Sequence, residues 1–287
     1  MNTIRQASII ISIILLASTA TAFSFNMENS KAAYIDLSGT ISASGPNSAF
    51  SSTGITPEQV RSLNEQAQNE GYDAVIYEIN SGGGTVVASK EVMREIDSME
   101  IPTVCRFRDI AASGAYLFSL GCDEIVADEA SLTGSIGVRG SYLEFSEALE
   151  EYGIEYVNIS AGEFKGVGSP YENATEEDRE ILQERASEIH QQFLNLVKEK
   201  RNLTQSQIDD VGDGRVILGT EAREKGLVDH LGGREKSENV AGNLTDSSLS
   251  FESLSTTESF NFFSLLSASI SEGLNTVFSE APITAKL

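Results

Sequence analysis

Short apolar runs and amphipathic segments alternate along much of the chain. Ala33–Leu37 and Ala74–Ile79 are compact apolar runs, which predict buried strands. Between them, Val60, Leu63 and Ala67 recur at the spacing of one helix face. Strands that alternate with helices need crossover connections. The pattern therefore predicts an α/β domain with repeated β-α units and a mostly parallel sheet.

The same alternation continues towards the C-terminus. A long helix is predicted from Thr175 towards Arg201, and Gly153 is a suitable left-handed cap for a helix that ends beside it. The other predicted segments are strands over 103–106, 125–127 and 154–159 and helices over 113–120 and 142–152.

The first 25 residues have the composition of a targeting segment. Arg5 precedes the apolar stretch Ser8–Ala17, and Ala20-Thr21-Ala22 supplies small residues at a cleavage site. Extended through Phe25, the stretch approaches the roughly 20 residues that span a bilayer. We therefore expect residues 1–25 to be a signal peptide or an N-terminal membrane anchor, with the following domain extracytoplasmic. The alternative is a buried N-terminal helix of a cytoplasmic protein.

The amino-acid composition changes near residue 235. Ser, Thr, Glu and Asn dominate the next two dozen residues, which predicts a polar linker over 236–259 after a domain over 31–235. Apolar residues then recur at three- and four-residue steps from Phe263 to Val277. This spacing predicts an amphipathic helix over 260–279 that docks on a neighbouring subunit or lies on a membrane surface.

Charge and cysteine content narrow the possible partners. The chain has 43 acidic and 20 basic residues, a formal charge of −23, and such a surface repels nucleic acid and anionic lipid headgroups. It indicates either a salt-rich solvent or widely dispersed carboxylates. Cys105 and Cys122 are compatible with two packed thiols or with one disulfide. Neither cysteine has metal-ligand spacing, and with only two histidines we expect no zinc site.

Ser113 has small neighbours, Ala112 and Gly114, so a substrate backbone could approach its hydroxyl. If a helix begins here, its first amides favour a developing oxyanion. A serine in this setting can equally serve as a helix cap or a packing residue.

Gly82-Gly83-Gly84 follows a predicted buried strand directly. Consecutive glycines can aim backbone N–H groups at one point and let a ligand lie against the main chain. A phosphate-binding turn is disfavoured because the phosphate-loop lysine and the dinucleotide spacing are both missing. A plain tight turn is the simpler interpretation.

Two later segments, Thr133–Gly137 and Gly162–Gly166, contain Ser135 and Lys165. A lysine acts as a general base only when its amine is neutral, and desolvation is what lowers its pKa far enough. Lys165 lies among Gly, Val and Pro rather than in a run of charges. An ordinary solvated surface lysine remains the alternative.

Together these segments resemble the signal peptide peptidase A family of serine–lysine peptidases, whose fold belongs with the Clp protease and crotonase proteins. The resemblance runs from about Lys31 to Gly233 and includes Gly212–Arg215 and Gly226–Asp229. It rests on the order of the motifs: a glycine turn, Ala-Ala-Ser-Gly, Leu-Thr-Gly-Ser-Ile-Gly, then Lys before Ser-Pro. Gly82 departs from the family's usual Pro, and Ala115 from a second Gly.

The resemblance implies a role for each motif residue. Ser113 would be the nucleophile, Lys165 its general base and Ser135 the residue that orients the lysine amine. The backbone amides of Gly84 and Gly114 would form the oxyanion hole, with Gly83 shaping the turn. His190 and His230 accompany no suitable Ser or Cys motif, so a Ser–His triad is not expected.

The implied activity is a serine endopeptidase without metal or organic cofactor. Its substrates would be extended apolar peptides, such as remnant signal peptides at the membrane surface, and it would work as a homo-oligomer. Two other functions stay open. One is a catalytically idle binding or assembly module. The other is a crotonase-type acyl-CoA enzyme, which export would separate from CoA.

Overall fold

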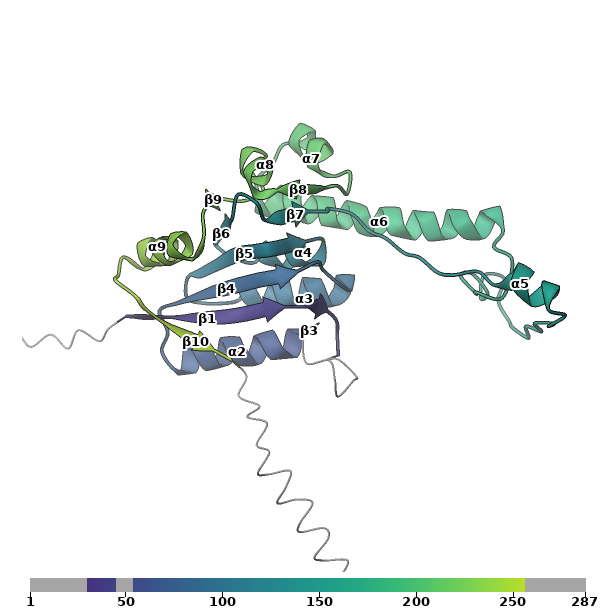
Figure 1. The fold of residues 1–287 in the computed structure, drawn as a ribbon, viewed down its shortest axis with the longest axis horizontal. Helices are drawn as coiled ribbons and strands as arrows, with labels where there is room; N and C mark the ends of the chain where they lie inside the picture. Colours follow the sequence, from purple (N-terminus) through teal and green to yellow (C-terminus); the bar gives the residue numbers. More distant parts are fainter. Residues whose placement is uncertain (1–29, 45–53, 256–287) are drawn as a thin grey trace, which may run out of the picture. The chain divides into compact units, whose positions relative to one another are not determined.

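The computed structural model describes residues 30–44 and 54–255. Within that part, strands and helices alternate as the sequence pattern predicts (Figure 1). The elements are β1 (Lys31–Ser38), β2 (Thr40–Ile41), β3 (Gly54–Ile55), α2 (Pro57–Asn69), β4 (Ala74–Ser81), α3 (Val86–Asp97), β5 (Thr103–Ala112), α4 (Gly114–Ser119), β6 (Glu124–Ala127), β7 (Leu132–Gly134), α5 (Ser146–Glu151), α6 (Glu176–Lys200), α7 (Gln205–Val211), β8 (Val216–Leu218), α8 (Gly219–Glu224), β9 (His230–Leu231), α9 (Arg234–Thr245) and β10 (Ser250–Leu254).

The main sheet has the order β10-β1-β4-β5-β6-β9. All neighbours along this path pair in parallel. The end of β5 pairs with β7 instead of β6, and β7 pairs antiparallel with β8. The predicted α/β class with a mostly parallel sheet is confirmed.

The two faces of the sheet are covered differently. One large core cluster joins β1, β4 and β5 to apolar residues of α2, α3, α4 and α6. A smaller cluster on the opposite face packs Tyr34, Ile76 and Val104 against Val240 and Ala241 of α9. Side chains alternate between these two clusters along β1, β4, β5 and β6, as the pleat requires.

Helix caps are predicted well because they depend on local chemistry. The Thr56 hydroxyl accepts a hydrogen bond from the Gln59 amide at the start of α2. At α6, Thr175 and Asp178 form a reciprocal capping box. The predicted helix from Thr175 towards Arg201 is confirmed, with Thr175 as its N-cap and Arg201 as its C-cap.

Between the sheet and α6, one local prediction is wrong and another is confirmed only in part. The segment 154–159, predicted as a strand, has no regular structure, and Ile159 is 93% exposed. The helix predicted over 142–152 is limited to α5. Strand formation needs a neighbouring strand to take its hydrogen bonds and cover its apolar face, and no strand pairs with this segment in the described chain.

The polar linker predicted over 236–259 is also wrong for most of its length. Residues 234–245 form α9, which buries Val240 and Ala241 on the sheet. Residues 250–254 form β10, which pairs in parallel with β1 and ends at the buried Leu254. The compact unit therefore extends to Leu254. The predicted segments 1–25 and 260–279 lie outside the described residues.

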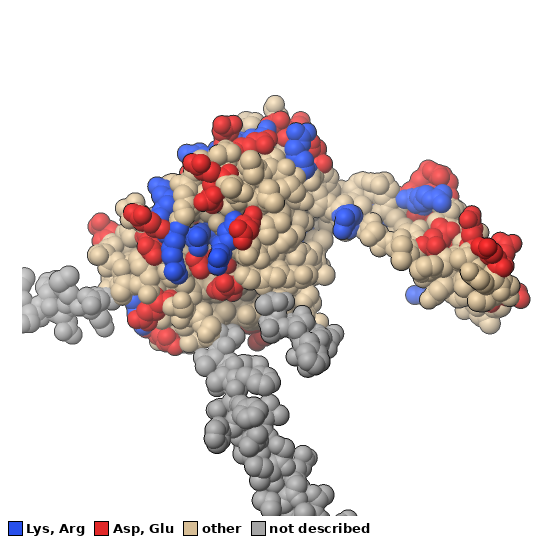
Figure 2. All heavy atoms as spheres, in the orientation of Figure 1, with Lys and Arg blue, Asp and Glu red and all other residues tan. Residues whose placement is uncertain are grey.

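Charged side chains of both signs adjoin on the surface. On the face shown in Figure 2, Lys and Arg lie among Asp and Glu rather than in a separate basic region. Examples are the ion pairs Arg61–Glu95 and Arg106–Glu78. The acidic excess is thus partly paired locally.

The described residues contain no helix with the length and apolar character needed to cross a bilayer.

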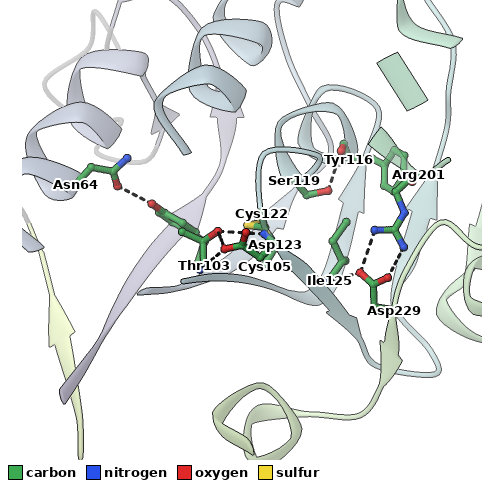
Figure 3. Close-up of a disulfide and its surroundings, with 11 residues drawn as sticks. Asn64, Thr103, Cys105, Tyr116, Ser119, Cys122, Asp123, Ile125, Arg201 and Asp229 are labelled. Carbon is green, nitrogen blue, oxygen red and sulfur yellow. Dashed lines mark hydrogen bonds and ion pairs between the residues drawn. A yellow bond between two sulfur atoms is a disulfide. The ribbon is translucent and has the colours of Figure 1, made fainter. Parts of the chain in front are cut away.

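A disulfide joins Cys105 of β5 to Cys122, directly after α4, with their Cα atoms 5.8 Å apart (Figure 3). The Asp123 carboxylate beside it accepts hydrogen bonds from the amide and hydroxyl of Thr103. Of the two alternatives compatible with the sequence, packed thiols or a disulfide, the structure has the disulfide. It closes the chain around α4 and the serine that precedes it.

A second polar network ties the end of α6 to the sheet. The Arg201 guanidinium forms two hydrogen bonds with the Asp229 carboxylate, of 2.9 and 2.6 Å (Figure 3). Asp229 also accepts the Ile125 amide of β6, and the Tyr116 hydroxyl of α4 donates to the Leu227 carbonyl. The motif Gly226–Asp229 therefore connects three elements.

Candidate active site

Ser113 lies at a sharp turn between β5 and α4. Its backbone has φ 56° and ψ −121°, a combination that residues with a Cβ rarely adopt. Such a conformation costs about 1–3 kcal/mol and persists only where the surroundings hold it. Here the Ser113 amide donates to the Gly134 carbonyl (2.9 Å), and its carbonyl accepts the Leu117 amide (2.9 Å). The half-buried side chain is thus presented at the start of a helix.

The glycine turn after β4 lies against this serine. A Cβ on Gly83, whose φ is 104°, would be 3.0 Å from the Ser113 Cβ and 2.8 Å from the Gly114 nitrogen. A Cβ on Gly84 would be 2.0 Å from the Ile41 carbonyl oxygen. Glycine is therefore required at both positions by close approach of the backbone.

The amides of Gly84 and Gly114 lie close together. A Cβ on Gly114 would be 3.2 Å from the Gly84 nitrogen and 2.4 Å from the Ser89 hydroxyl oxygen. Neither amide donates a hydrogen bond to another described residue. Two unused donors beside a strained serine are the arrangement that stabilises a tetrahedral oxyanion.

Ser135 lines the same cavity as Ser113, which has a volume of about 600 Å³. It is the second site residue with a positive φ, 51°, and its amide donates to the Arg215 carbonyl (2.8 Å). Only four non-glycine residues in the described chain have positive φ, and two of them are Ser113 and Ser135. Strain of this kind concentrates at functional sites.

Lys165 is not brought to Ser113. It is exposed and lies outside the cavity that Ser113 lines. Its chain neighbours instead line a separate cavity of about 340 Å³ with Thr175 and Asp178, at the start of α6. Thr175 lines this separate cavity, whereas His190, further along α6, lines the Ser113 cavity. Between these two residues the helix rises about 22 Å, at 1.5 Å per residue. The described chain thus separates the two residues that the family resemblance pairs.

The cavity contains three charged or titratable residues that the sequence analysis gave no role: Arg139, His190 and Asp213. Hydrogen bonds from the Arg215 side chain and amide hold the pKa of Asp213 below its ordinary value. Asp213 belongs to the motif Gly212–Arg215, which the family resemblance includes without assigning it a function. No sequence pattern indicates His190 as a site residue, because it reaches the site only through the packing of α6. His230 pairs with Glu124 and does not line this cavity.

Known proteins match this chain in sequence. The model of Peptidase family S49 matches residues 95–247, more than half of the chain. The chain is 33% identical over 208 residues to "Putative signal peptide peptidase SppA" of Enterococcus faecium, covering 71% of this chain and 60% of that protein. It is 33% identical to "Putative protease MJ0651" of Methanocaldococcus jannaschii, covering 63% and 61%. The chain thus spans about three fifths of the length of these relatives.

A solved structure has the same fold. A mutant of the 1510-N membrane-bound stomatin-specific protease, in complex with a substrate peptide, aligns with a TM-score of 0.53. The alignment covers 84% of this chain and all of that one at 13% identity. It supports the architecture alone.

Proposed function

Because the chain belongs to peptidase family S49, we propose that it is a serine endopeptidase with Ser113 as the nucleophile. The observation that carries the proposal is the strained Ser113 backbone beside the unused amides of Gly84 and Gly114.

The proposed reaction follows from this geometry. The Ser113 hydroxyl loses its proton to a base, and its oxygen attacks the carbonyl carbon of a peptide bond. The oxyanion accepts hydrogen bonds from Gly84 and Gly114. The intermediate collapses as the base returns the proton to the leaving amine. Water then gives a proton to the base and attacks the acyl carbon, and Ser113 leaves as the base returns that proton to its oxygen.

We propose Lys165 as the base and Ser135 as the residue that orients its amine. An exposed lysine is protonated at neutral pH, so catalysis needs an arrangement that desolvates the amine next to Ser113. Two arrangements can do this: residues 139–175 bend back towards the cavity, or a second copy in a homo-oligomer supplies the lysine. Mixing Ser113→Ala with Lys165→Ala distinguishes them, because only exchange between copies restores activity.

The test of the function uses a fluorophosphonate probe, which acylates activated serines. The wild type is expected to be labelled and to cleave extended apolar peptides, whereas Ser113→Ala, Lys165→Ala and Lys165→Arg lose both activities by at least about 10³-fold. Ser135→Ala is expected to be milder. Lys200→Ala, which removes an exposed lysine at the end of α6, serves as the control.

The rival functions make different predictions. A catalytically idle module would leave Ser113 unlabelled in a folded wild type, and a crotonase-type enzyme would convert acyl-CoA thioesters and leave peptides uncleaved. A folded Lys165→Ala variant with near wild-type peptidase activity would overturn the Ser–Lys mechanism.

We further propose that the enzyme acts outside the cytoplasm, tethered to or released from a membrane by residues 1–25. The Cys105–Cys122 disulfide supports an oxidising compartment, where such bonds persist. Peptides left in or near the membrane, such as remnant signal peptides, would then be the available substrates.

A further inference from the structure

His190 is the side chain through which α6 reaches the candidate active site. It lies in the part of α6 that packs on the domain, just before the buried Phe193 and Val197. Its Nε2 atom is 3.0 Å from the Ile136 carbonyl oxygen. A carbonyl only accepts hydrogen bonds, so Nε2 carries the proton and donates.

The segment that receives this bond is the one that carries Ser135. Gly134 accepts the Ser113 amide (2.9 Å), Ser135 donates to the Arg215 carbonyl (2.8 Å) and Ile136 accepts His190. Three consecutive residues are therefore held by the nucleophile turn, by the residue before β8 and by α6. The first two partners are backbone groups, so His190 is the one side chain among these three tethers.

The bond has a specific consequence for strain. Ser135 has a positive φ, and Ser113, which is bonded to the preceding residue, has one as well. Unfavourable backbone conformations relax when the contacts that over-determine them are removed. Loss of the tether at Ile136 would let Ser135 leave its conformation, and the Gly134 carbonyl that holds Ser113 would move with it.

We propose that His190 is a positioning residue, whose Nε2–H fixes the Ile136 carbonyl and thereby keeps Ser135 and Ser113 in their strained conformations at the cavity. The inference rests on the proposed function for its catalytic consequence, although the fixed backbone can be tested without it. His190 transfers no proton in this role, because its donor is committed to the carbonyl.

Two variants separate hydrogen bonding from size. His190→Gln keeps an N–H donor of similar reach, whereas His190→Leu keeps comparable bulk without a donor. Loss of one hydrogen bond corresponds to roughly a three- to tenfold effect, and relaxation of both serines should amplify it. We expect His190→Leu to lower kcat/KM and Ser113 labelling by at least tenfold, mainly through kcat, and His190→Gln to stay within about threefold of wild type. Gln191→Leu, an exposed neighbour bonded to Asn195, controls for substitution in α6.

A second readout is independent of peptidase activity. Amide hydrogen exchange over residues 132–140 should be at least tenfold faster in His190→Leu than in wild type, with His190→Gln and Gln191→Leu unchanged. Wild-type exchange and activity in His190→Leu would overturn the positioning role. Equal loss in both His190 variants, with melting temperatures preserved, would overturn it too, since His190 would then act as more than a donor. Failure of the proposed function is distinguishable, because it would leave wild-type Ser113 unlabelled while the exchange pattern still decides the role of His190.

Discussion

At the scale of single residues, the site depends on positions where a side chain would collide with the backbone. A Cβ on Gly114 meets the Ser89 hydroxyl at 2.4 Å and the Gly84 nitrogen at 3.2 Å. The Ser89 side chain can turn aside by giving up its hydrogen bond to the Thr85 carbonyl. At Gly84 the collision is with the backbone of Ile41, which cannot rotate away. Gly114 is therefore the better position for perturbing the oxyanion site while the fold is kept.

Gly114→Ala is expected to lower Ser113 acylation by about 100-fold, in line with the loss of one oxyanion donor. The methyl group would crowd the space between the two amides, so the effect should appear in kcat. Burst kinetics and probe labelling measure it. Gly233→Ala, where a Cβ meets nothing within 4 Å, is the matched control and should retain activity. Equal activities in the two variants would argue against an oxyanion role for this amide.

At the scale of elements, α6 is joined to the sheet by the Arg201–Asp229 pair. Burial tends to raise the pKa of Asp229, but the hydrogen bonds and charge of Arg201 outweigh it and hold the pKa below its ordinary value. A carboxyl whose pKa is lower in the folded state stabilises the fold above its unfolded pKa of about 3.9. That contribution disappears as the pH falls through the folded pKa.

Asp229→Asn is expected to destabilise the protein by about 3 kcal/mol at pH 7, because it leaves the largely buried Arg201 without its counter-charge. The difference from wild type should shrink below about pH 4. Urea unfolding at pH 7 and pH 3.5 measures both values. Glu58→Gln, which removes an exposed partner of Arg61, should change stability by less than about 0.5 kcal/mol. A pH-independent difference would contradict the ionic explanation.

A second prediction at the scale of elements concerns the effect of the disulfide on the melting temperature. It closes a loop with a sequence separation of 17 that contains Ser113 and α4. Cross-linking a loop of this length restricts the unfolded chain by about 3 kcal/mol. Replacing both cysteines with Ala should lower the melting temperature by roughly 6–12 °C for a domain of this size. Reductant should lower that of the wild type and leave the double variant unchanged; equal melting temperatures would show that the bond is absent in solution.

At the scale of the whole molecule, the excess of acidic residues sets how stability depends on salt. A formal charge of −23 opposes compaction through self-repulsion, and ion pairs such as Arg61–Glu95 offset only part of it. Screening weakens this repulsion, since the Debye length falls to about 3 Å at 1 M salt.

The melting temperature is therefore expected to rise between low salt and roughly 1 M sodium chloride. Differential scanning calorimetry at a series of concentrations measures the trend. Repeating the series at pH 5, where part of the carboxylate charge is lost, should give a smaller rise. A midpoint that stays flat or falls with salt would contradict adaptation to a salt-rich solvent.

Sequence alone was sufficient wherever the deciding forces were local or periodic. Thr56 and Thr175 cap helices through their own neighbours. β1 and β4 are buried on both faces, so their short apolar runs identified them as strands. The role of Ser113 as nucleophile stays a prediction, which the family resemblance implies from the order of its motifs.

Only the tertiary structure decided what depends on a distant partner. Residues 154–159 are as apolar as a strand but have no strand to pair with, whereas the polar residues of β10 form a strand because β1 offers an edge. His190 lines the cavity because α6 packs on the domain there. Lys165 lies outside the cavity because its chain neighbours pack at the start of α6, about 22 Å along that helix from His190. Composition records the local preference of a segment, while pairing and desolvation are fixed only when segments far apart in sequence meet.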